Sequence, residues 1–360
     1  MIITRTPFRV SFFGGGTDYP AWYRQNGGAV LSATINKYCY LTLRYKPPFH
    51  EHRYRIVYRK IETCLEREQI EHPVVRAVLQ KLDIRRGLEI HHDSDLPARA
   101  GMGSSSAFTV GLLNALHAHS GRIRGKHELA REAIVVEQDI LGETVGSQDQ
   151  TASAYGGLNH IQFLANDTIV VRPLTLSAAR IEEFQSHLML FFTGISRTAE
   201  EVALSYVDKI HESPSRLEAL GGMVDEGIGL LSGRADISEI GALLHEAWQV
   251  KQSLSPQVSN RRVDEIYETA RRAGALGGKL SGAGGGGFML LFVPPDRQAG
   301  VRQALDDLVY VPLSFDFDGS KVVFFEPEED WQELDEHRVT QKLRRFKEHA
   351  SVLDEEKAPG

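Results

Sequence analysis

A turn rich in glycine and serine, Pro97–Ala107, runs directly into a segment with the apolar periodicity of a helix, Phe108–His119. One face of that segment carries Phe108, Leu112, Ala115, Leu116 and His119. Because serine commonly caps helix N-termini, the turn predicts a helix start. Free amides and the positive end of the helix dipole favour an anion such as a polyphosphate there, and a serine hydroxyl can ligate Mg²⁺. An ordinary serine-capped turn is the alternative.

The chain is long enough for two hydrophobic cores. Its 360 residues exceed the usual size of one core, so we expect domains at 1–175 and 176–330, followed by a charged helix and tail at 331–360. A net charge of −7 without a concentrated basic stripe argues against nucleic acid as a partner.

Two further features bear on the cellular compartment. The two cysteines, Cys39 and Cys64, are too few and too irregularly placed for a disulfide framework or a Cys-rich zinc site. The N-terminus lacks a charged-then-apolar leader, and no apolar run approaches the ~20 residues of a membrane span. We therefore expect a cytoplasmic monomer or homodimer that does not insert into membranes.

The N-terminal stretch Ile2–Phe13 alternates polar and apolar residues as a strand does, and it ends in the loop Gly14–Pro20. Tyr19 stands where a dinucleotide-binding Gly-x-Gly-x-x-Gly motif needs its third glycine, so that motif is excluded. The loop instead predicts room for a small polar ligand, and Asp18 offers it two acceptor oxygens. An ordinary turn role for Asp18 is the alternative. The loop residues assigned to this ligand are Gly15, Gly16, Thr17 and Asp18.

The remaining pattern predicts a mixed α/β chain. In the first half, strands are expected at 29–34, 38–44, 54–58, 87–95 and 158–163, and helices at 72–82, 126–141 and 151–155. The second half is richer in helix, at 198–211, 215–231, 237–254 and 263–273, with strands at 186–193, 288–293, 310–315 and 322–326.

Two carboxylates and a second turn stand at junctions between these elements. Glu137, at the edge of the buried stripe of helix 126–141, either pairs with a basic neighbour, holds a cation or is partly exposed. Asp149 is a candidate base or a helix N-cap. The turn Ser281–Gly287 holds five glycines within residues 282–287, which is costly unless its backbone must approach a partner closely.

Three of these elements, in this order and spacing, resemble the GHMP kinases: the strand with Arg9 and its glycine loop, the turn Pro97–Ala107 and the turn Ser281–Gly287. The resemblance covers about residues 2–326. The family motif Pro-x-x-x-Gly-Leu-Gly-Ser-Ser-x-Ala is specific, and the chain departs from it only at Met102, which replaces leucine at similar volume. The resemblance implies a two-domain α/β (α+β) fold, with an N-terminal mixed sheet with helices, a C-terminal ferredoxin-like domain and an active site between them.

The resemblance also implies ATP and Mg²⁺ as cofactors and assigns roles to residues. The turn residues that would cradle the ATP phosphates are Gly101, Met102, Gly103, Ser104, Ser105 and Ser106. Ser105 and Glu137 match the family's Mg²⁺ ligands, with Ser104 and Ser106 as substitutes for the serine. Asp149 matches the catalytic aspartate, and Arg9 would pair with Asp149 and keep it ionised.

Within the family, the opening Phe8–Pro20 is similar to the D-glycero-D-manno-heptose 7-phosphate kinase branch. This implies phosphorylation of the anomeric hydroxyl of that sugar, giving the 1,7-bisphosphate for nucleotide-activated heptose synthesis. Galactokinases have Glu-His where Gly15 and Gly16 stand, which disfavours galactose. A kinase for another sugar, such as L-fucose, a galactose-like sugar or an unphosphorylated heptose, and a non-catalytic regulator that binds ATP and sugar are the alternatives.

Contacts with the acceptor follow from the same motif matches. Asp18 would bind sugar hydroxyls, and the second turn, with Gly284 and Gly285, would close over the substrate. A remote phosphate on the acceptor needs a basic residue. The candidates for that contact are Lys37, Arg55 and Arg197.

Overall fold

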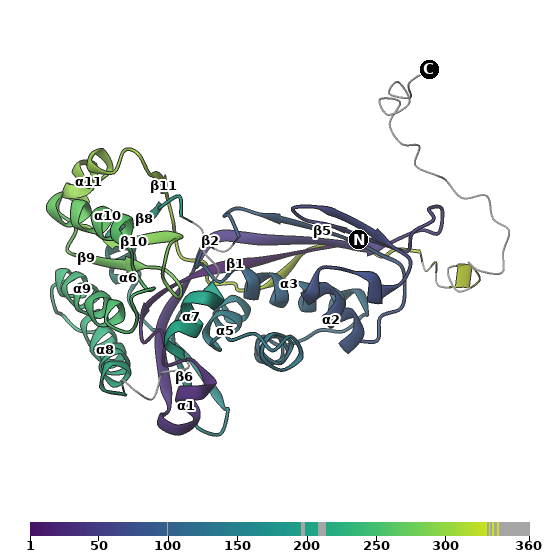
Figure 1. Ribbon diagram of the computed structural model, residues 1–360, viewed down its shortest axis with the longest axis horizontal. Coiled ribbons are helices and arrows are strands. Elements are labelled where there is room, and N and C mark those ends of the chain that lie inside the picture. Colours follow the sequence, from purple (N-terminus) through teal and green to yellow (C-terminus); the bar gives the residue numbers. More distant parts are fainter. Residues whose placement is uncertain are drawn as a thin grey trace, which may run out of the picture.

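The computed structural model describes residues 1–98, 100–195, 199–207 and 214–329, together with 331, 333, 334 and 337. Within them the chain forms two sheets, an eight-stranded one and a four-stranded antiparallel one, and helices pack on both (Figure 1). The predicted two-domain α/β fold is confirmed.

The larger sheet is built on two long strands, β1 (Ile2–Phe13) and β2 (Gly28–Tyr45), which pair in antiparallel register. The strand order is β12-β1-β2-β5-β3-β4; β6 pairs with the first part of β2, and β7 pairs with β6. The shorter strands are β3 (Tyr54–Val57), β4 (Ile61–Cys64), β5 (Leu88–Ser94), β6 (Leu158–Phe163), β7 (Ile169–Pro173) and β12 (Lys321–Phe325). The two strands expected at 29–34 and 38–44 are one strand, because its register shift against β1 bends it without ending it.

Helices cover one face of this sheet. Figure 1 shows α2, α3 and α5 along the long strands, with α3 (Ser104–His119) packed on β1 and β2. Gly111 permits this close approach, since a Cβ there would lie 2.8 Å from Thr6 Oγ1. The fully buried leucines at the centre of α3, Leu112 and Leu116, each contribute about 1.5–3 kcal/mol relative to an exposed position. The other helices of this half are α1 (Pro20–Asn26), α2 (Pro73–Lys81), α4 (Lys126–Ile134) and α5 (Gln148–Tyr155).

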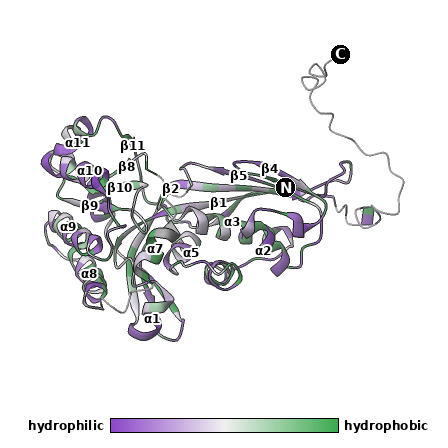
Figure 2. Cartoon of the chain, viewed as in Figure 1, coloured by the Kyte–Doolittle hydropathy of each residue, from purple (hydrophilic) through white to green (hydrophobic). Residues whose placement is uncertain are grey.

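The second half of the chain forms the smaller sheet, in the order β11-β8-β10-β9. Its strands are β8 (Leu188–Phe192), β9 (Gly277–Leu280), β10 (Phe288–Phe292) and β11 (Val309–Val311). Its helices are α6 (Ala178–Ser186), α7 (Ala199–Val207), α8 (Pro214–Ser232), α9 (Ser238–Gln252), α10 (Arg261–Arg272) and α11 (Gln298–Ala304). Figure 2 shows hydrophilic residues on the outer helices α10 and α11, and every residue of β10 is buried.

The boundary of the second domain and the helix at 126–141 depart from the sequence-based expectation. We expected 176–330 to form the second domain, but β12, at the end of that range, pairs with β1 in the first sheet. We also expected one α-helix over 126–141. The structure instead has α4 followed by a π-helical turn, η2 (Val135–Ile140), which changes the direction of the side chains that follow.

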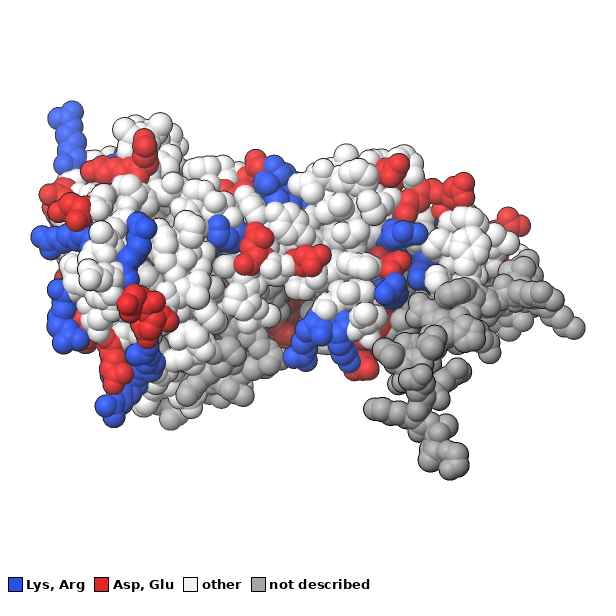
Figure 3. Space-filling model, turned by 90° about the horizontal axis from the view of Figure 1, so that it is seen from above, with Lys and Arg blue, Asp and Glu red and all other residues white. Residues whose placement is uncertain are grey.

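The described surface carries charges of both signs. On the face shown in Figure 3, Lys and Arg side chains are interspersed with Asp and Glu over the residues drawn in colour. None of the helices among the described residues has the length and hydropathy needed to cross a bilayer.

Candidate active site

A bidentate ion pair joins β1 to the beginning of α5. Arg9 Nε donates to Asp149 Oδ1 at 2.7 Å, and its Nη2 donates to Oδ2 at 2.8 Å. The Arg9 side chain is only 4% exposed and that of Asp149 is 26% exposed, so the pair is buried on one side and open on the other. Two parallel N–H···O bonds fix the orientation of the carboxylate as well as its charge.

The same arginine holds the first glycine turn. Arg9 Nη1 donates to the carbonyl oxygen of Gly101 at 2.7 Å, and the Arg9 backbone N–H donates to that of Met102 at 3.1 Å. The next glycine, Gly103, caps α3 in the left-handed conformation, with φ of +74°. A Cβ on Gly103 would lie 3.3 Å from Asp149 Oδ2. The N-terminus of α3 and the Asp149 carboxylate are therefore neighbours.

Three serines follow at the N-terminus of α3. Ser104 is half-buried and Ser105 is exposed, whereas Ser106 is buried and donates from Oγ to Glu137 Oε2 at 2.9 Å. The Ser105 hydroxyl, predicted to bind Mg²⁺ together with Glu137, points elsewhere than that of Ser106, because consecutive helical residues point about 100° apart. The N-terminal position leaves backbone amides without intrahelical acceptors, which suits an anion.

Glu137 lies in the π-helical turn and is fully buried. Burial raises the pKa of Glu137 to about 7, against the neighbouring Thr109, Gln150 and Ser106 side chains, which favour the ionised form. The Thr109 hydroxyl itself donates to the Ser105 carbonyl at 3.2 Å. Its Oε1 has no hydrogen-bond partner among the described residues. A buried carboxylate oxygen without a partner is costly, and a hard cation such as Mg²⁺ fits it. In the described part of the chain no three His, Cys, Asp or Glu side chains form a metal cluster, so the nucleotide would supply the other oxygens.

The loop after β1 places Asp18 beside this pair. Gly16 donates its N–H to Asp18 Oδ1 at 3.0 Å, and Asp18 accepts from Ser147 N–H through its carbonyl at 2.9 Å, which ties the loop to the start of α5. Burial raises the pKa of Asp18, and the Asp149 carboxylate raises it further. The Thr17 hydroxyl is used within the loop, since it donates to Gly14 and Ala29 carbonyls.

The second glycine turn lies directly against the first. A Cβ on Gly101 would lie 2.3 Å from the Ser281 carbonyl oxygen, and one on Gly282 would lie 2.7 Å from Gly101 Cα. The expected role of the Gly285 amide in covering the substrate is not supported, because that amide donates to the Val258 carbonyl at 2.8 Å. Gly284 also faces Val258, since a Cβ there would lie 2.5 Å from the same oxygen.

Comparison with known proteins places this arrangement in a family. The model for the GHMP kinases N terminal domain matches residues 69–157, and the model for the GHMP kinases C terminal domain matches residues 230–311. The D-glycero-alpha-D-manno-heptose 7-phosphate kinase of Campylobacter jejuni is 32% identical over 321 residues, which cover 84% of this chain and 93% of that protein. The chain belongs to the GHMP kinases. It is therefore a kinase that uses ATP.

Two more relatives agree with this assignment. A bifunctional fucokinase/GDP-fucose pyrophosphorylase of Arabidopsis thaliana is 26% identical over 84% of this chain, which spans 31% of that longer protein. The crystal structure of a D-glycero-D-manno-heptose 1-phosphate kinase from Bacteroides thetaiotaomicron superposes with a TM-score of 0.75 at 26% identity, covering 91% of this chain and all of that one.

Two of the basic residues expected to meet a substrate phosphate in this GHMP kinase, Lys37 and Arg55, are engaged by neighbouring residues. Lys37 Nζ donates to the Asn36 backbone and side-chain oxygens, and Arg55 pairs with Glu89 at 3.2 Å. Arg55 stands opposite the start of β5, whereas the phosphate turn follows the end of β5. Arg197 lies outside the described residues.

Two lysines that sequence reasoning missed lie beside the Arg9–Asp149 pair. Lys251, in the last turn of α9, is 5% exposed, and Lys279, on β9, is 4% exposed. Burial, and after it the Arg9 charge, lowers the pKa of Lys251 to about 8. Burial lowers the pKa of Lys279 as well, followed by the charge of Lys251. Lys251 carries no motif, and Lys279 stands just before the second glycine turn, which was interpreted from its glycines alone.

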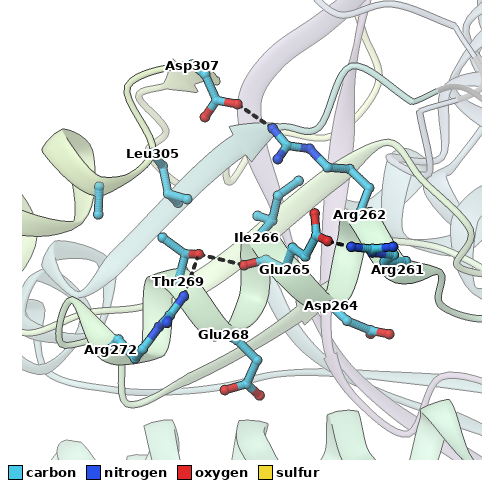
Figure 4. Close-up of a pocket in the computed structure, with 11 residues that line it drawn as sticks. Arg261, Arg262, Asp264, Glu265, Ile266, Glu268, Thr269, Arg272, Leu305 and Asp307 are labelled. Carbon is cyan, nitrogen blue, oxygen red and sulfur yellow. Dashed lines mark hydrogen bonds and ion pairs between the residues drawn. The ribbon is translucent and has the colours of Figure 1, made fainter.

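A surface hollow of about 960 Å³ lies elsewhere, between α10 and the segment around α11 (Figure 4). Two of its three arginines form ion pairs, Arg261 with Glu265 at 2.8 Å and Arg262 with Asp307. The residues that line the hollow include four carboxylates, Asp264, Glu265, Glu268 and Asp307, against three arginines, a charge balance that disfavours the phosphates of ATP.

Proposed function

We propose that this GHMP kinase transfers the γ-phosphoryl group of ATP to the anomeric hydroxyl of a heptose phosphate, with D-glycero-D-manno-heptose 7-phosphate as substrate and the 1,7-bisphosphate as product. The relatives support a heptose phosphate, since one is named a heptose 7-phosphate kinase and one a heptose 1-phosphate kinase. The observation that carries the chemistry is the Arg9–Asp149 pair held beside the N-terminus of α3.

The ATP phosphates bind at the first glycine turn in this proposal. Backbone amides from Gly101 to Ser105, together with the positive end of the α3 dipole, neutralise charge on the transferring group. Phosphoryl transfer passes through a loose transition state, so positioning and electrostatic stabilisation supply most of the acceleration. The buried Arg9 guanidinium fixes the turn relative to the acceptor side, because it binds both Gly101 and Asp149.

The acceptor hydroxyl lies against Asp149. As its oxygen bonds to the γ-phosphorus, the bond from that phosphorus to the bridging oxygen of ADP breaks and the hydroxyl proton passes to an Asp149 carboxylate oxygen. Arg9 orients that carboxylate before transfer through its two hydrogen bonds and compensates its charge. Such a base contributes about 10²–10⁴-fold to the rate.

Mg²⁺ would be held by Glu137 and by the exposed hydroxyl of Ser105, with Ser106 supporting the Glu137 carboxylate. When bound, the ion would neutralise part of the negative charge on the ATP phosphates during transfer. The partnerless Oε1 of Glu137 supports this assignment.

The test is Mg²⁺-dependent ADP release over D-glycero-D-manno-heptose 7-phosphate, the free heptose, L-fucose, galactose and mevalonate. We expect turnover with the heptose 7-phosphate at a kcat/KM at least about tenfold above every other acceptor. Preference for an unphosphorylated sugar would overturn the substrate. Binding of ATP and sugar without turnover would overturn catalysis.

A further inference from the structure

Basic side chains outnumber carboxylates around the acceptor site. Arg9 and Asp149 compensate each other through two hydrogen bonds. That leaves Lys251 and Lys279 with Asp18 as the remaining carboxylate that acts on both, and burial lowers the pKa of both lysines. An anionic ligand would supply the missing negative charge and favour the protonated form of each lysine.

The two ammonium groups also have donors to spare. An ammonium carries three N–H donors. Lys251 Nζ donates to the Gly282 carbonyl, and Lys279 Nζ donates to the Phe12 carbonyl at 3.2 Å. Among the described residues neither lysine forms an ion pair with a carboxylate. Burying an ammonium without a counter-ion is costly. Two buried lysines side by side therefore indicate a bound anion that offsets this cost.

Partnerless polar atoms surround the same place. Ser11 Oγ on β1, Ser281 Oγ after β9 and Gln148 Oε1 next to Asp149 are buried and have no hydrogen-bond partner among the described residues. A Cβ on Gly15 would lie 3.6 Å from Ser11 Oγ, which puts that hydroxyl at the glycine loop. Buried polar groups are normally satisfied, so this set indicates a polar ligand.

Two other cations considered for an acceptor phosphate, Lys37 and Arg55, are engaged elsewhere. Lys37 bonds to Asn36, and Arg55 bonds to Glu89 at the far end of β5. We propose that Lys251 and Lys279 bind the phosphate group that the acceptor already carries, and thereby select a phosphorylated over an unphosphorylated sugar. This inference rests on the proposed function and adds the residues that set its specificity.

The test compares Lys251→Met and Lys279→Met with the wild type, using heptose 7-phosphate and free heptose as acceptors. Methionine keeps the apolar stem of the side chain and removes the charge. We expect each variant to raise KM for the heptose 7-phosphate about 10–100-fold, with kcat within threefold and KM for ATP unchanged. With free heptose the variants should match the wild type, so the preference for the phosphorylated acceptor collapses.

Lys46→Met is the matched control. Lys46 is 4% exposed, as deeply buried as the other two, but its ammonium lies 3.8 Å from Glu89 at the opposite end of β2. We expect this variant to keep the wild-type acceptor preference. A collapse of preference in Lys46→Met as well would overturn the inference, because the loss of any buried lysine would then suffice.

Four other outcomes would overturn the inference or the proposed substrate. A rise in KM for ATP would mean that the lysines serve the nucleotide, and an equal loss of kcat with both acceptors would mean a structural role. A wild type that prefers the phosphorylated acceptor, with variants that keep this preference, overturns the inference alone. A wild type without that preference overturns the proposed substrate itself.

A measurement on the wild type covers the case in which the variants do not fold. Lys251, whose pKa is about 8 beside Arg9, Asp18, Asp149 and Lys279, loses its charge as pH rises through that value. A phosphate ester remains fully ionised there, since its second pKa is about 6. We expect kcat/KM for the heptose 7-phosphate to fall between pH 7 and 9.5 more steeply than kcat/KM for free heptose. Parallel profiles would contradict the inference.

Discussion

Replacing Gly101 by alanine tests whether the contact between the two glycine turns maintains the site. A Cβ there would lie 2.3 Å from the Ser281 carbonyl oxygen, at a φ of +75°. The left-handed conformation costs an alanine about 1 kcal/mol. Because a carbon–oxygen contact relaxes to about 3.3 Å, the second turn must also move by about 1 Å. Such overpacking costs about 1–3 kcal/mol more, and a displacement of about 1 Å near the chemistry costs about 10²-fold in rate.

Gly121→Ala is the control for backbone conformation alone. Gly121 follows the C-terminal end of α3 with a φ of +68°, and nothing lies within 4 Å of its Cβ position. We expect this variant to lose about 1 kcal/mol of unfolding free energy and to keep wild-type kcat. Gly101→Ala should lose about 2–4 kcal/mol and about 10²-fold in kcat. Urea unfolding and ADP release at saturating acceptor measure both, and equal kcat in the two variants would refute the reasoning.

Three further outcomes test single groups. Asp149→Asn should lower kcat about 10²–10⁴-fold with KM for ATP nearly unchanged, because the amide cannot accept the proton. If steady-state kinetics show that the variant keeps the wild-type kcat, Asp149 is not the general base. The Glu137 carboxyl, with a pKa of about 7, must lose its proton to bind the cation. The Mg²⁺ concentration for half-maximal rate should therefore rise about tenfold per pH unit below about pH 7 and stay level above it. A titration of activity with Mg²⁺ at several pH values from 5.5 to 8.5 checks this. Ser106→Ala removes a hydrogen bond from ionised Glu137, so the Mg²⁺ requirement should begin to rise at a higher pH than in the wild type. Ser105→Ala should raise the Mg²⁺ requirement at every pH. The nucleotide titrates identically in all these proteins, so profiles that match the wild type would exclude the support of Glu137 by Ser106 and the binding of Mg²⁺ by Ser105.

Local elements with strong periodicity could be predicted from the sequence. The strand at 2–13 and the helix that follows the Pro97–Ala107 turn are both present, because alternation and helical spacing are signals within a short window. Strand β9 could not be predicted in this way, since Gly277-Gly-Lys-Leu280 has little β-propensity and owes its conformation to pairing with β10. The π-helical turn at Glu137 likewise leaves no mark in the apolar pattern of 126–141.

The site was predictable only where the family motif covers it. Arg9 and Asp149 are 140 positions apart, so no spacing rule pairs them, and the resemblance to GHMP kinases supplied that pairing. The motif did not resolve which serine contacts Glu137, because this depends on the rotation of α3 about its axis. It also did not reveal that the Gly285 amide and the Thr17 hydroxyl are occupied by neighbouring carbonyls.

The two missed lysines show why charge in a helix pattern is ambiguous. A lysine in a helix normally marks the solvated face, yet Lys251 is buried because α9 lies directly on β9. Glycines permit that approach, since a Cβ on Gly277 would lie 1.9 Å from the Gly241 carbonyl oxygen. In the proposed arrangement, the ATP side of the site therefore comes from the first half of the chain, and the charges for the acceptor phosphate come from the second half. Substitutions on either side should then change affinity for one substrate alone, whereas substitutions at the contact between the glycine turns should change turnover of both together.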